Sequence, residues 1–239
     1  MNTPIDTQPD NDLYSAFFQR GALLLGDERM ERIRGLRVIL FGVGGVGSWC
    51  AEALIRTGIT RLTLVDFDTV APSNINRQLP ATADTIGRPK VEAMRERLLS
   101  ITPRADIRAL CMPYNEQNRS HFPLEQFDVV IDCIDSIPDK TLLITHATSL
   151  PAVRFYSSMG AARKVDPTRV RIAPFNKVQG CPLARALRQR MRREHTFPQA
   201  PFLCAYSDEP PILAQKGSLV YVTAVFGLIL AAQVINDTP

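Results

Sequence analysis

Apolar runs alternate with amphipathic segments along this chain of 239 residues. Four apolar runs predict strands, at 38–41, 62–65, 106–111 and 127–133. The last run is almost continuously apolar, as in a parallel strand buried on both faces. The segments between them predict helices, at 49–57, 89–101 and 138–150. Right-handed crossovers through such helices produce an open, doubly wound sheet. The pattern therefore predicts a Rossmann-like α/β fold, mostly parallel, with helices on both faces.

The rest of the chain predicts one domain over residues 13–239, with a C-terminal elaboration, after a disordered tail at 1–12. The elaboration begins with two strands and one helix, expected at 152–158, 169–173 and 182–193. Residues 194–216 are proline-rich and irregular, which is typical of a lid or a crossover loop.

A run without charge closes the chain at residues 217–235. Its 19 residues are at the lower margin for spanning a bilayer, so membrane association is one reading. Thr223, Gly227 and Gln233 dilute its apolarity. A helix buried against the sheet is therefore the favoured interpretation.

Composition narrows the class of protein. Apolar residues make up 45% of the chain and charged residues 22%, as in ordinary globular proteins. The net charge of +4 is compatible with a nucleic-acid partner without requiring one. Five cysteines without a C-x-x-C pair argue for a reducing compartment and against a disulfide framework or a cysteine zinc site. The polar N-terminus carries no secretory signal, and together these features predict a cytoplasmic protein.

A glycine turn follows the first strand. Gly42, Gly44 and Gly47 fit G-x-G-x-x-G, with Gly45 as an additional glycine. Glycines allow a tight turn and let backbone N–H groups approach a phosphate closely. Asp66 ends the second strand about 20 residues later, where a carboxylate reaches ribose hydroxyls. The motif predicts a nucleotide site and leaves open whether the nucleotide is a redox cofactor or a substrate.

The connection after Asp66 is unusually long and polar. It runs over residues 67–83, whereas such connections normally take a few residues, and this length predicts a functional loop. It is rich in polar residues, among them Asn74, Asn76, Arg77 and Gln78.

Taken together, the motifs resemble the ubiquitin-activating-type adenylating superfamily, in its ThiF/MoeB-like branch. The segments that carry the resemblance are Gly42–Ser48, Asp66–Asp68, Ser73–Gln78, Gly87–Lys90 and Cys133–Ser136. Further segments are similar to members that dehydrate a modified adenosine in tRNA: 157–162, 180–184 and 217–227.

The resemblance implies binding of ATP with Mg²⁺ and activation of a carboxylate. In the dehydrating members this carboxylate belongs to threonylcarbamoyladenosine, next to the tRNA anticodon, and an internal nitrogen closes a ring with loss of water. Such chemistry needs cations and a metal on the phosphates more than it needs a protein nucleophile. The resemblance also implies a link to a cysteine-desulfurase or sulfur-acceptor partner.

Site residues follow from the resemblance. Asp66 would hold the ribose, and Asn74, Arg77 and Lys90 would contact the phosphates. Asp135 would coordinate Mg²⁺, which favours a carboxylate together with phosphate oxygens and water. Arg77, Lys90 and Asp135 are thus the expected catalytic residues.

Two further residues are assigned in the same way. Gln78 would support the ATP pocket. Arg20 matches an arginine that reaches into the ATP site of a partner subunit, so the expected functional unit is a homodimer. On pattern alone, an arginine before an apolar helix is commonplace.

Arginines gather on the helix expected at 182–193. Arg185, Arg188 and Arg192 share one face at i, i+3 and i+7. They predict a phosphate-binding stripe for tRNA together with four other basic residues, Arg163, Lys164, Arg169 and Arg171. A run of charge is also typical of a solvated face.

Two cysteines are candidates for the thioester or persulfide that some relatives form. Cys181 precedes a helix and has arginines nearby, which lowers a thiol pKa, and Cys204 lies in the irregular segment. The cyclisation itself needs no thiolate, so burial as small apolar residues is the favoured interpretation.

Other functions compete with tRNA dehydration. An activator that adenylates the C-terminus of a ubiquitin-like sulfur carrier usually carries two C-x-x-C pairs for zinc, which this chain lacks. A nicotinamide-dependent oxidoreductase would leave Asn74, Arg77 and Lys90 without a role. A binding module with a degenerate ATP site is a third alternative, although every matched position is intact.

Overall fold

The computed structural model describes residues 16–211 and 217–239. The tail expected at 1–12 lies outside the described residues. The helices are α2 (Gln19–Leu25), α3 (Asp27–Gly35), α4 (Gly47–Arg56), α5 (Lys90–Ile101), α6 (Ile137–Thr148), α7 (Pro182–Glu194) and α8 (Val220–Asn236). The strands are β1 (Arg37–Phe41), β2 (Arg61–Val65), β3 (Asp106–Leu110), β4 (Val129–Asp132), β5 (Arg154–Ser158), β6 (Val170–Pro174) and β7 (Leu203–Ser207).

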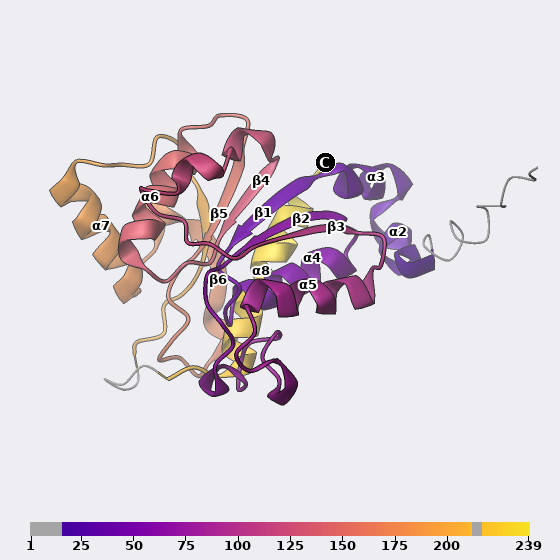
Figure 1. Cartoon of the computed structure of the whole chain (residues 1–239). Coiled ribbons are helices and arrows are strands. Elements are labelled where there is room, and N and C mark those ends of the chain that lie inside the picture. The colour runs from indigo at the N-terminus through magenta and orange to yellow at the C-terminus, as the bar shows by residue number, and fades with distance from the viewer. Residues whose placement is uncertain (1–15, 212–216) are drawn as a thin grey trace, which may run out of the picture.

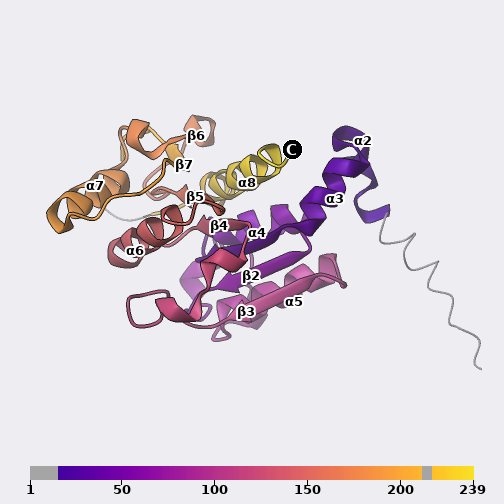
Figure 2. The ribbon, with the colours of Figure 1, turned by 90° about the horizontal axis from the view of Figure 1, so that it is seen from above.

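A seven-stranded sheet forms the centre of the fold, in the order β3-β2-β1-β4-β5-β7-β6. All neighbouring strands are parallel except β6, which pairs antiparallel with β7. Figures 1 and 2 show helices on both sides of this sheet. The predicted doubly wound, mostly parallel α/β fold is therefore confirmed.

The continuous apolar character of β1 follows from burial on both faces. Val38 and Leu40 pack with α4, α5 and α8 in one core, whereas Ile39 and Phe41 pack with α6 and α7 in the other. Alternate side chains of a strand point to opposite faces, so a strand between two helical layers needs apolar residues at every position.

The prediction of an irregular segment over 194–216 is wrong at 203–207. There the chain forms β7, which lies between β5 and β6 inside the sheet. The sequence of this strand, Leu-Cys-Ala-Tyr-Ser, contains no β-branched residue, and prolines precede it. Long-range pairing with β5 and β6 determines this strand, and a local pattern does not report such pairing.

The expected helix in the uncharged C-terminal run is α8. It packs on α4, and a Cβ at Gly227 would lie 2.4 Å from Val46 O, so the two backbones approach closely. Val222, Phe226 and Leu230 are fully buried, in agreement with the favoured interpretation. Within residues 16–211 and 217–239, none of the helices combines the length and apolarity that crossing a membrane requires.

The carboxyl ends of β1, β2 and β4 meet at one edge of the sheet. The strand order changes direction between β1 and β4, and ligands of doubly wound folds bind at such a switch point. The long connection from β2 to α5 contains two short 3₁₀ turns, Pro72–Asn74 and Ala83–Thr85. In Figure 1 this connection projects below the sheet.

Candidate nucleotide site

The glycine turn joins β1 to α4 in a conformation that excludes side chains at two positions. Gly42 has a φ of +89°, and a Cβ there would lie 2.7 Å from Cys133 O. A Cβ at Gly47 would lie only 1.8 Å from Gly42 O. The turn therefore brings its backbone N–H groups and the N-terminus of α4 to the edge of the cavity, and no side chains at these two positions shield them from a ligand.

Gly47→Ala is expected to distort this turn. Because the clash is with backbone, we expect the free energy of unfolding to fall by about 1–3 kcal/mol and ATP binding to be lost. Thermal unfolding and calorimetric titration with ATP measure the two effects. Gly35→Ala is the matched control, since a Cβ there meets nothing within 4 Å. Unchanged ATP affinity in Gly47→Ala would show that the turn does not form part of the site.

Asp66 connects the glycine turn with the polar loop. Its Oδ2 accepts a hydrogen bond from Val43 N at 2.7 Å, and its Oδ1 accepts one from Asp68 N at 2.9 Å. Burial raises the pKa of Asp66, while these hydrogen bonds and the charge of Lys90 oppose the rise. Each carboxylate oxygen retains a lone pair, so the side chain can also accept a ribose hydroxyl.

The polar loop places three of the predicted residues at the same cavity. Asn74 is buried, and its Oδ1 accepts from Ala71 N at 3.1 Å, which closes the 3₁₀ turn. The Arg77 guanidinium donates to Ser73 O at 2.8 Å and to Asn76 Oδ1 at 2.9 Å. These contacts orient Arg77 and leave donors of its guanidinium for an anion.

Gln78 carries a polar atom that lacks a partner. Its side chain is 7% exposed, and its Oε1 makes no hydrogen bond among the described residues. A buried acceptor without a donor is costly, so its place at the cavity wall fits a ligand that donates a hydrogen bond there.

Lys90 begins α5 and is 5% exposed. Its ammonium donates to Asp68 Oδ2 at 2.6 Å, and Asp68 itself is half exposed. An ammonium has three donors, so Lys90 can hold Asp68 and a phosphate at once.

Asp135 lies in the short loop that follows β4, and a buried ion pair supports that loop. Lys140 Nζ lies 2.8 Å from Asp132 Oδ2, and both side chains are fully buried. Lys140 also donates to Ile134 O at 2.9 Å, while Ile134 N donates to Asp132 Oδ1 at 3.0 Å. Ser157 completes the set by donating to Asp132 Oδ2. Burial raises the pKa of Asp132, and the Lys140 charge opposes this rise.

One cavity of about 870 Å³ collects the predicted nucleotide residues. Its walls include Gly42, Gly44, Gly45, Asp66, Asn74, Arg77, Gln78, Lys90 and Asp135. The predicted Gly47 is buried behind the turn and does not line the cavity. Two carboxylates and two cations thus share one space, as the prediction of a nucleotide site requires.

A magnesium ion fits this donor set. Asp135 is exposed to the cavity, and Mg²⁺ is usually held by one or two carboxylates together with substrate phosphates and water. Among the described residues no cluster of three or more His, Cys, Asp or Glu side chains could hold a metal by protein ligands alone. The metal would therefore enter with the triphosphate.

The predicted Arg20 lies elsewhere. It is exposed on α2 and does not line the cavity of its own chain. This position agrees with a role in a neighbouring subunit and excludes a role in its own site in this conformation.

The two candidate cysteines are both buried. Cys204 lies inside β7, and burial raises the pKa of its thiol to about 12, which argues against a nucleophilic thiolate. Cys181 precedes α7 and is 2% exposed. The favoured interpretation, small apolar residues in the core, agrees with both positions.

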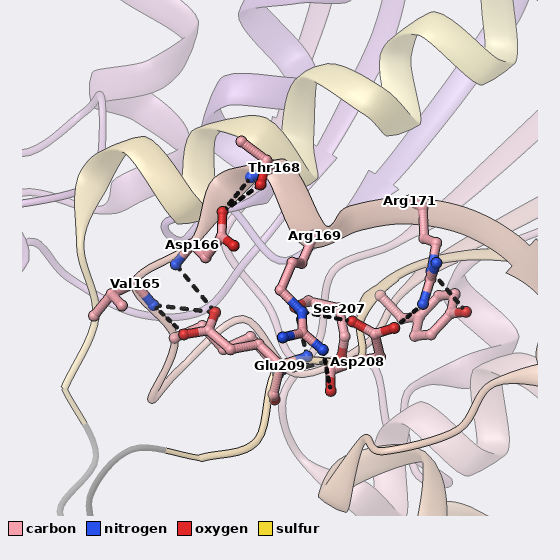
Figure 3. Close-up of polar contacts among 10 residues, drawn as sticks. Val165, Asp166, Thr168, Arg169, Arg171, Ser207, Asp208 and Glu209 are labelled. Carbon is pink, nitrogen blue, oxygen red and sulfur yellow. Dashed lines mark hydrogen bonds and ion pairs between the residues drawn. The ribbon is translucent and has the colours of Figure 1, made fainter.

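The predicted basic stripe divides into two parts. Lys164 is 3% exposed and donates to Ser207 O and Glu209 O, so the prediction that it contacts nucleic acid is wrong for this conformation. Arg169 and Arg171 both pair with Asp208, while the Glu209 carboxylate accepts from Val165 N and Asp166 N, as Figure 3 shows. This network holds two loops together and neutralises their charge.

The remaining arginines of the predicted stripe are better placed to contact nucleic acid. Arg163 lines the nucleotide cavity, with a φ of +64°. On α7, Arg185 and Arg192 are exposed, whereas Arg188 is half buried and donates to Phe175 O and Val178 O. The stripe thus reduces to the exposed face of α7 and the cavity arginine.

Three residues that support the site were not predicted. Asp68, which holds Lys90, lies in a segment that carries the family resemblance but was given no role. The pair of Asp132 and Lys140, which fixes the loop of Asp135, carries no sequence motif. The local sequence of α6 does not single out this lysine, because the helix also contains Asp139 and His146.

The glycine turn, a carboxylate at the end of β2 and cations at the switch point of the sheet are the features of a nucleotide-binding α/β protein. The ThiF family model matches residues 18–236. The chain belongs to the ThiF family.

Several relatives are similar over nearly their whole length. The tRNA threonylcarbamoyladenosine dehydratase of Bacillus subtilis is 36% identical, covering 92% of this chain and 93% of the relative. The protein of the same name from Haemophilus influenzae is 32% identical and covers 94% of each. A crystal structure of the Escherichia coli dehydratase TcdA in complex with ATP is 30% identical, covers 95% of both chains and has a TM-score of 0.89.

The likeness to carrier activators is shorter. The molybdopterin-synthase adenylyltransferase of Escherichia coli is 34% identical, but the match covers 47% of this chain and 45% of that protein. The match to the adenylyltransferase thus spans about half of each chain, and the full-length likeness favours the dehydratases.

Proposed function

We propose that this protein uses ATP to dehydrate threonylcarbamoyladenosine next to the tRNA anticodon to its cyclic form. The observation that carries the proposal is the single cavity that combines Asp66, Arg77, Lys90 and Asp135 in a chain similar to the dehydratases from end to end. The threonyl carboxylate attacks a phosphorus of ATP and breaks a P–O bond there, expelling pyrophosphate from the α-position or ADP from the γ-position. One carboxylate oxygen is then part of a good leaving group, which departs as AMP or as inorganic phosphate. A nitrogen of the same modification then attacks the carbonyl carbon, and the C–O bond breaks as the ring closes.

The residues of this chain act mainly by electrostatics. Arg77 and Lys90 hold the phosphates and stabilise the negative charge that develops there. Asp66 orients the ribose, and Asn74 keeps the polar loop closed. Asp135 would hold Mg²⁺, which supplies further charge neutralisation when it is bound. Arg77 and Lys90 could hold the phosphates equally well whether ATP is cleaved to AMP or to ADP.

The assay for this function uses purified protein, MgATP and tRNA that carries the modification. Gentle nucleoside analysis should show the cyclic product, lighter by one water. A carrier activator would instead exchange pyrophosphate only with a small protein ending in Gly-Gly. No cyclic nucleoside with tRNA, together with exchange on such a carrier, would overturn the proposal in favour of the alternative.

We also propose a homodimer in which Arg20 reaches the ATP site of the partner subunit. The exposed position of Arg20 on α2, outside the cavity of its own chain, supports this arrangement. Mixing the Arg20→Ala variant with an Asp135→Asn variant should restore part of the activity through hybrid dimers.

A cytoplasmic location would follow from the tRNA substrate, and an association with a cysteine-desulfurase system stays a prediction.

The exposed face of α7 is the proposed contact with tRNA phosphates. The double variant Arg185→Ala/Arg192→Ala should weaken tRNA binding and reduce the salt slope by about 1 for each lost phosphate contact. ATP binding should not change, because neither side chain lines the nucleotide cavity. Anisotropy titrations across a salt series measure both quantities.

Arg61→Ala provides the control for α7. Arg61 is exposed at the start of β2, so it lies at the opposite edge of the sheet from the cavity. The control removes one charge and the α7 variant two, so equal losses per removed charge would assign the effect to total charge and contradict a specific contact.

A further inference from the structure

A second cavity lies beside the C-terminal half of α7. Its volume is about 420 Å³, and α7 forms one wall while the proline-rich segment 197–202 forms another. The lining is aromatic and apolar, and includes Phe175, Met191, Phe197 and Phe202. Neither the family motifs nor the proposed chemistry uses this cavity.

The aromatic rings provide a rigid floor and an exposed face. Phe175 and Phe202 are buried and stacked, with ring centroids 5.0 Å apart and an interplanar angle of 19°. The Arg188 guanidinium lies 5.4 Å from the Phe175 centroid and is fixed by Phe175 O at 3.1 Å. Phe197 is 53% exposed. An exposed aromatic face beside a preformed apolar floor is a surface on which a flat ring can stack.

The polar groups at this cavity, one cation and two side-chain amides, are of the types that bind the phosphates and base edges of a nucleic acid. Arg192 lines it, is exposed and makes no ion pair among the described residues. Asn176 and Gln199 also line it, and a side-chain amide can donate to and accept from the edge of a base. An apolar segment of a protein would leave these amides and the arginine without a partner.

We propose that this cavity binds an unstacked nucleobase of the single-stranded RNA loop, with the base on Phe197 and the adjoining phosphate on Arg192. The inference rests on the proposed function, because that function makes RNA the substrate. Ala186 lines the nucleotide cavity and Arg192 lines the second cavity. Their six-residue separation is about 9 Å along a helix axis, so the two cavities border the same helix. We therefore assign the second cavity to a loop nucleotide other than the modified adenosine, which faces ATP in the first.

The test is equilibrium binding of a fluorescently labelled anticodon stem-loop RNA, without ATP, across a salt series. Phe197→Ala should lower affinity by about 5- to 100-fold, the loss expected for one base–aromatic stack, with an unchanged salt slope. Phe197→Tyr should bind as the natural protein does. Phe197→Leu should lose affinity as alanine does, because leucine offers no flat aromatic face. Since Phe197 is half exposed, none of these changes empties the core.

A second readout locates the base. 2-Aminopurine placed at successive loop positions should show an emission change at one position, which Phe197→Ala abolishes. Unchanged affinity in Phe197→Ala, or full affinity in Phe197→Leu, would overturn the assignment, the latter result showing that RNA binding does not depend on stacking against an aromatic ring.

Failure of this inference is separable from failure of the proposed function. RNA binding that depends on an aromatic residue at 197, without any cyclic nucleoside being formed, would refute the dehydratase proposal and keep the base site. Cyclic product with unchanged binding by Phe197→Ala would refute the base site alone. A natural protein that binds no RNA would refute both.

Discussion

Arg77→Ala and Lys90→Ala should each lower the turnover of tRNA dehydration by about 10²- to 10³-fold, the usual loss when one preorganised stabiliser of developing charge is removed. Both side chains line the nucleotide cavity, and both are held by polar partners before any ligand binds. Single-turnover assays with saturating tRNA measure the effect directly, and the two losses should not add fully because the cations act on the same phosphates.

Arg88→Ala is the control for both substitutions. Arg88 is only two residues from Lys90, but its guanidinium is exposed and paired with Glu96, outside the cavity. It should keep normal turnover. Loss of activity in Arg88→Ala equal to that in Lys90→Ala would contradict a specific role for the cavity cations. The folded state should tolerate Lys90→Ala, because the Asp68 left behind is half exposed and regains water.

Lys140→Met should have the largest effect on stability. The substitution leaves the Asp132 carboxylate buried without its counter-charge, which costs about 3–5 kcal/mol. For a chain of this length, that loss corresponds to a fall in Tm of about 10 °C. Thermal unfolding followed by circular dichroism measures it.

The double variant Asp132→Asn/Lys140→Met separates charge from packing. With its Oδ1 toward Ile134 N and its Nδ2 toward Ser157 Oγ, the neutral asparagine can accept from Ile134 and donate to the Ser157 hydroxyl, so most of the lost stability should return. The loop of Asp135 loses its Lys140 contact in both variants, and ATP affinity of the double variant reports what that contact contributes. A Tm of the single variant equal to that of the natural protein would show that the ion pair does not hold this part of the fold.

Much of the fold could be predicted because its strands are buried on both faces. In β1 and β4 nearly every side chain enters a core, so the apolar runs show directly in the sequence. β7 could not be predicted, since Leu203–Ser207 becomes a strand only through pairing with two strands that are distant in the chain.

The site was predictable where backbone geometry demands a residue type. Gly42 and Gly47 are required because a Cβ would meet backbone atoms, and such positions leave a motif. Lys164 shows the limit of charge patterns: a lysine among arginines indicates a solvated stripe, yet the ammonium is buried against Ser207 O and Glu209 O. Burial of a single cation depends on loops that meet only in the folded chain.

The central claim is that ATP activates the threonyl carboxylate, and the fate of one oxygen atom tests it most directly. tRNA would carry threonylcarbamoyladenosine with ¹⁸O in its carboxylate and react in a single turnover with MgATP. The account predicts that one ¹⁸O appears in the phosphate group of AMP or in inorganic phosphate, because the C–O bond breaks after oxygen has joined phosphorus. Cyclic product formed with all of the departing ¹⁸O in water, and none on phosphorus, would contradict it.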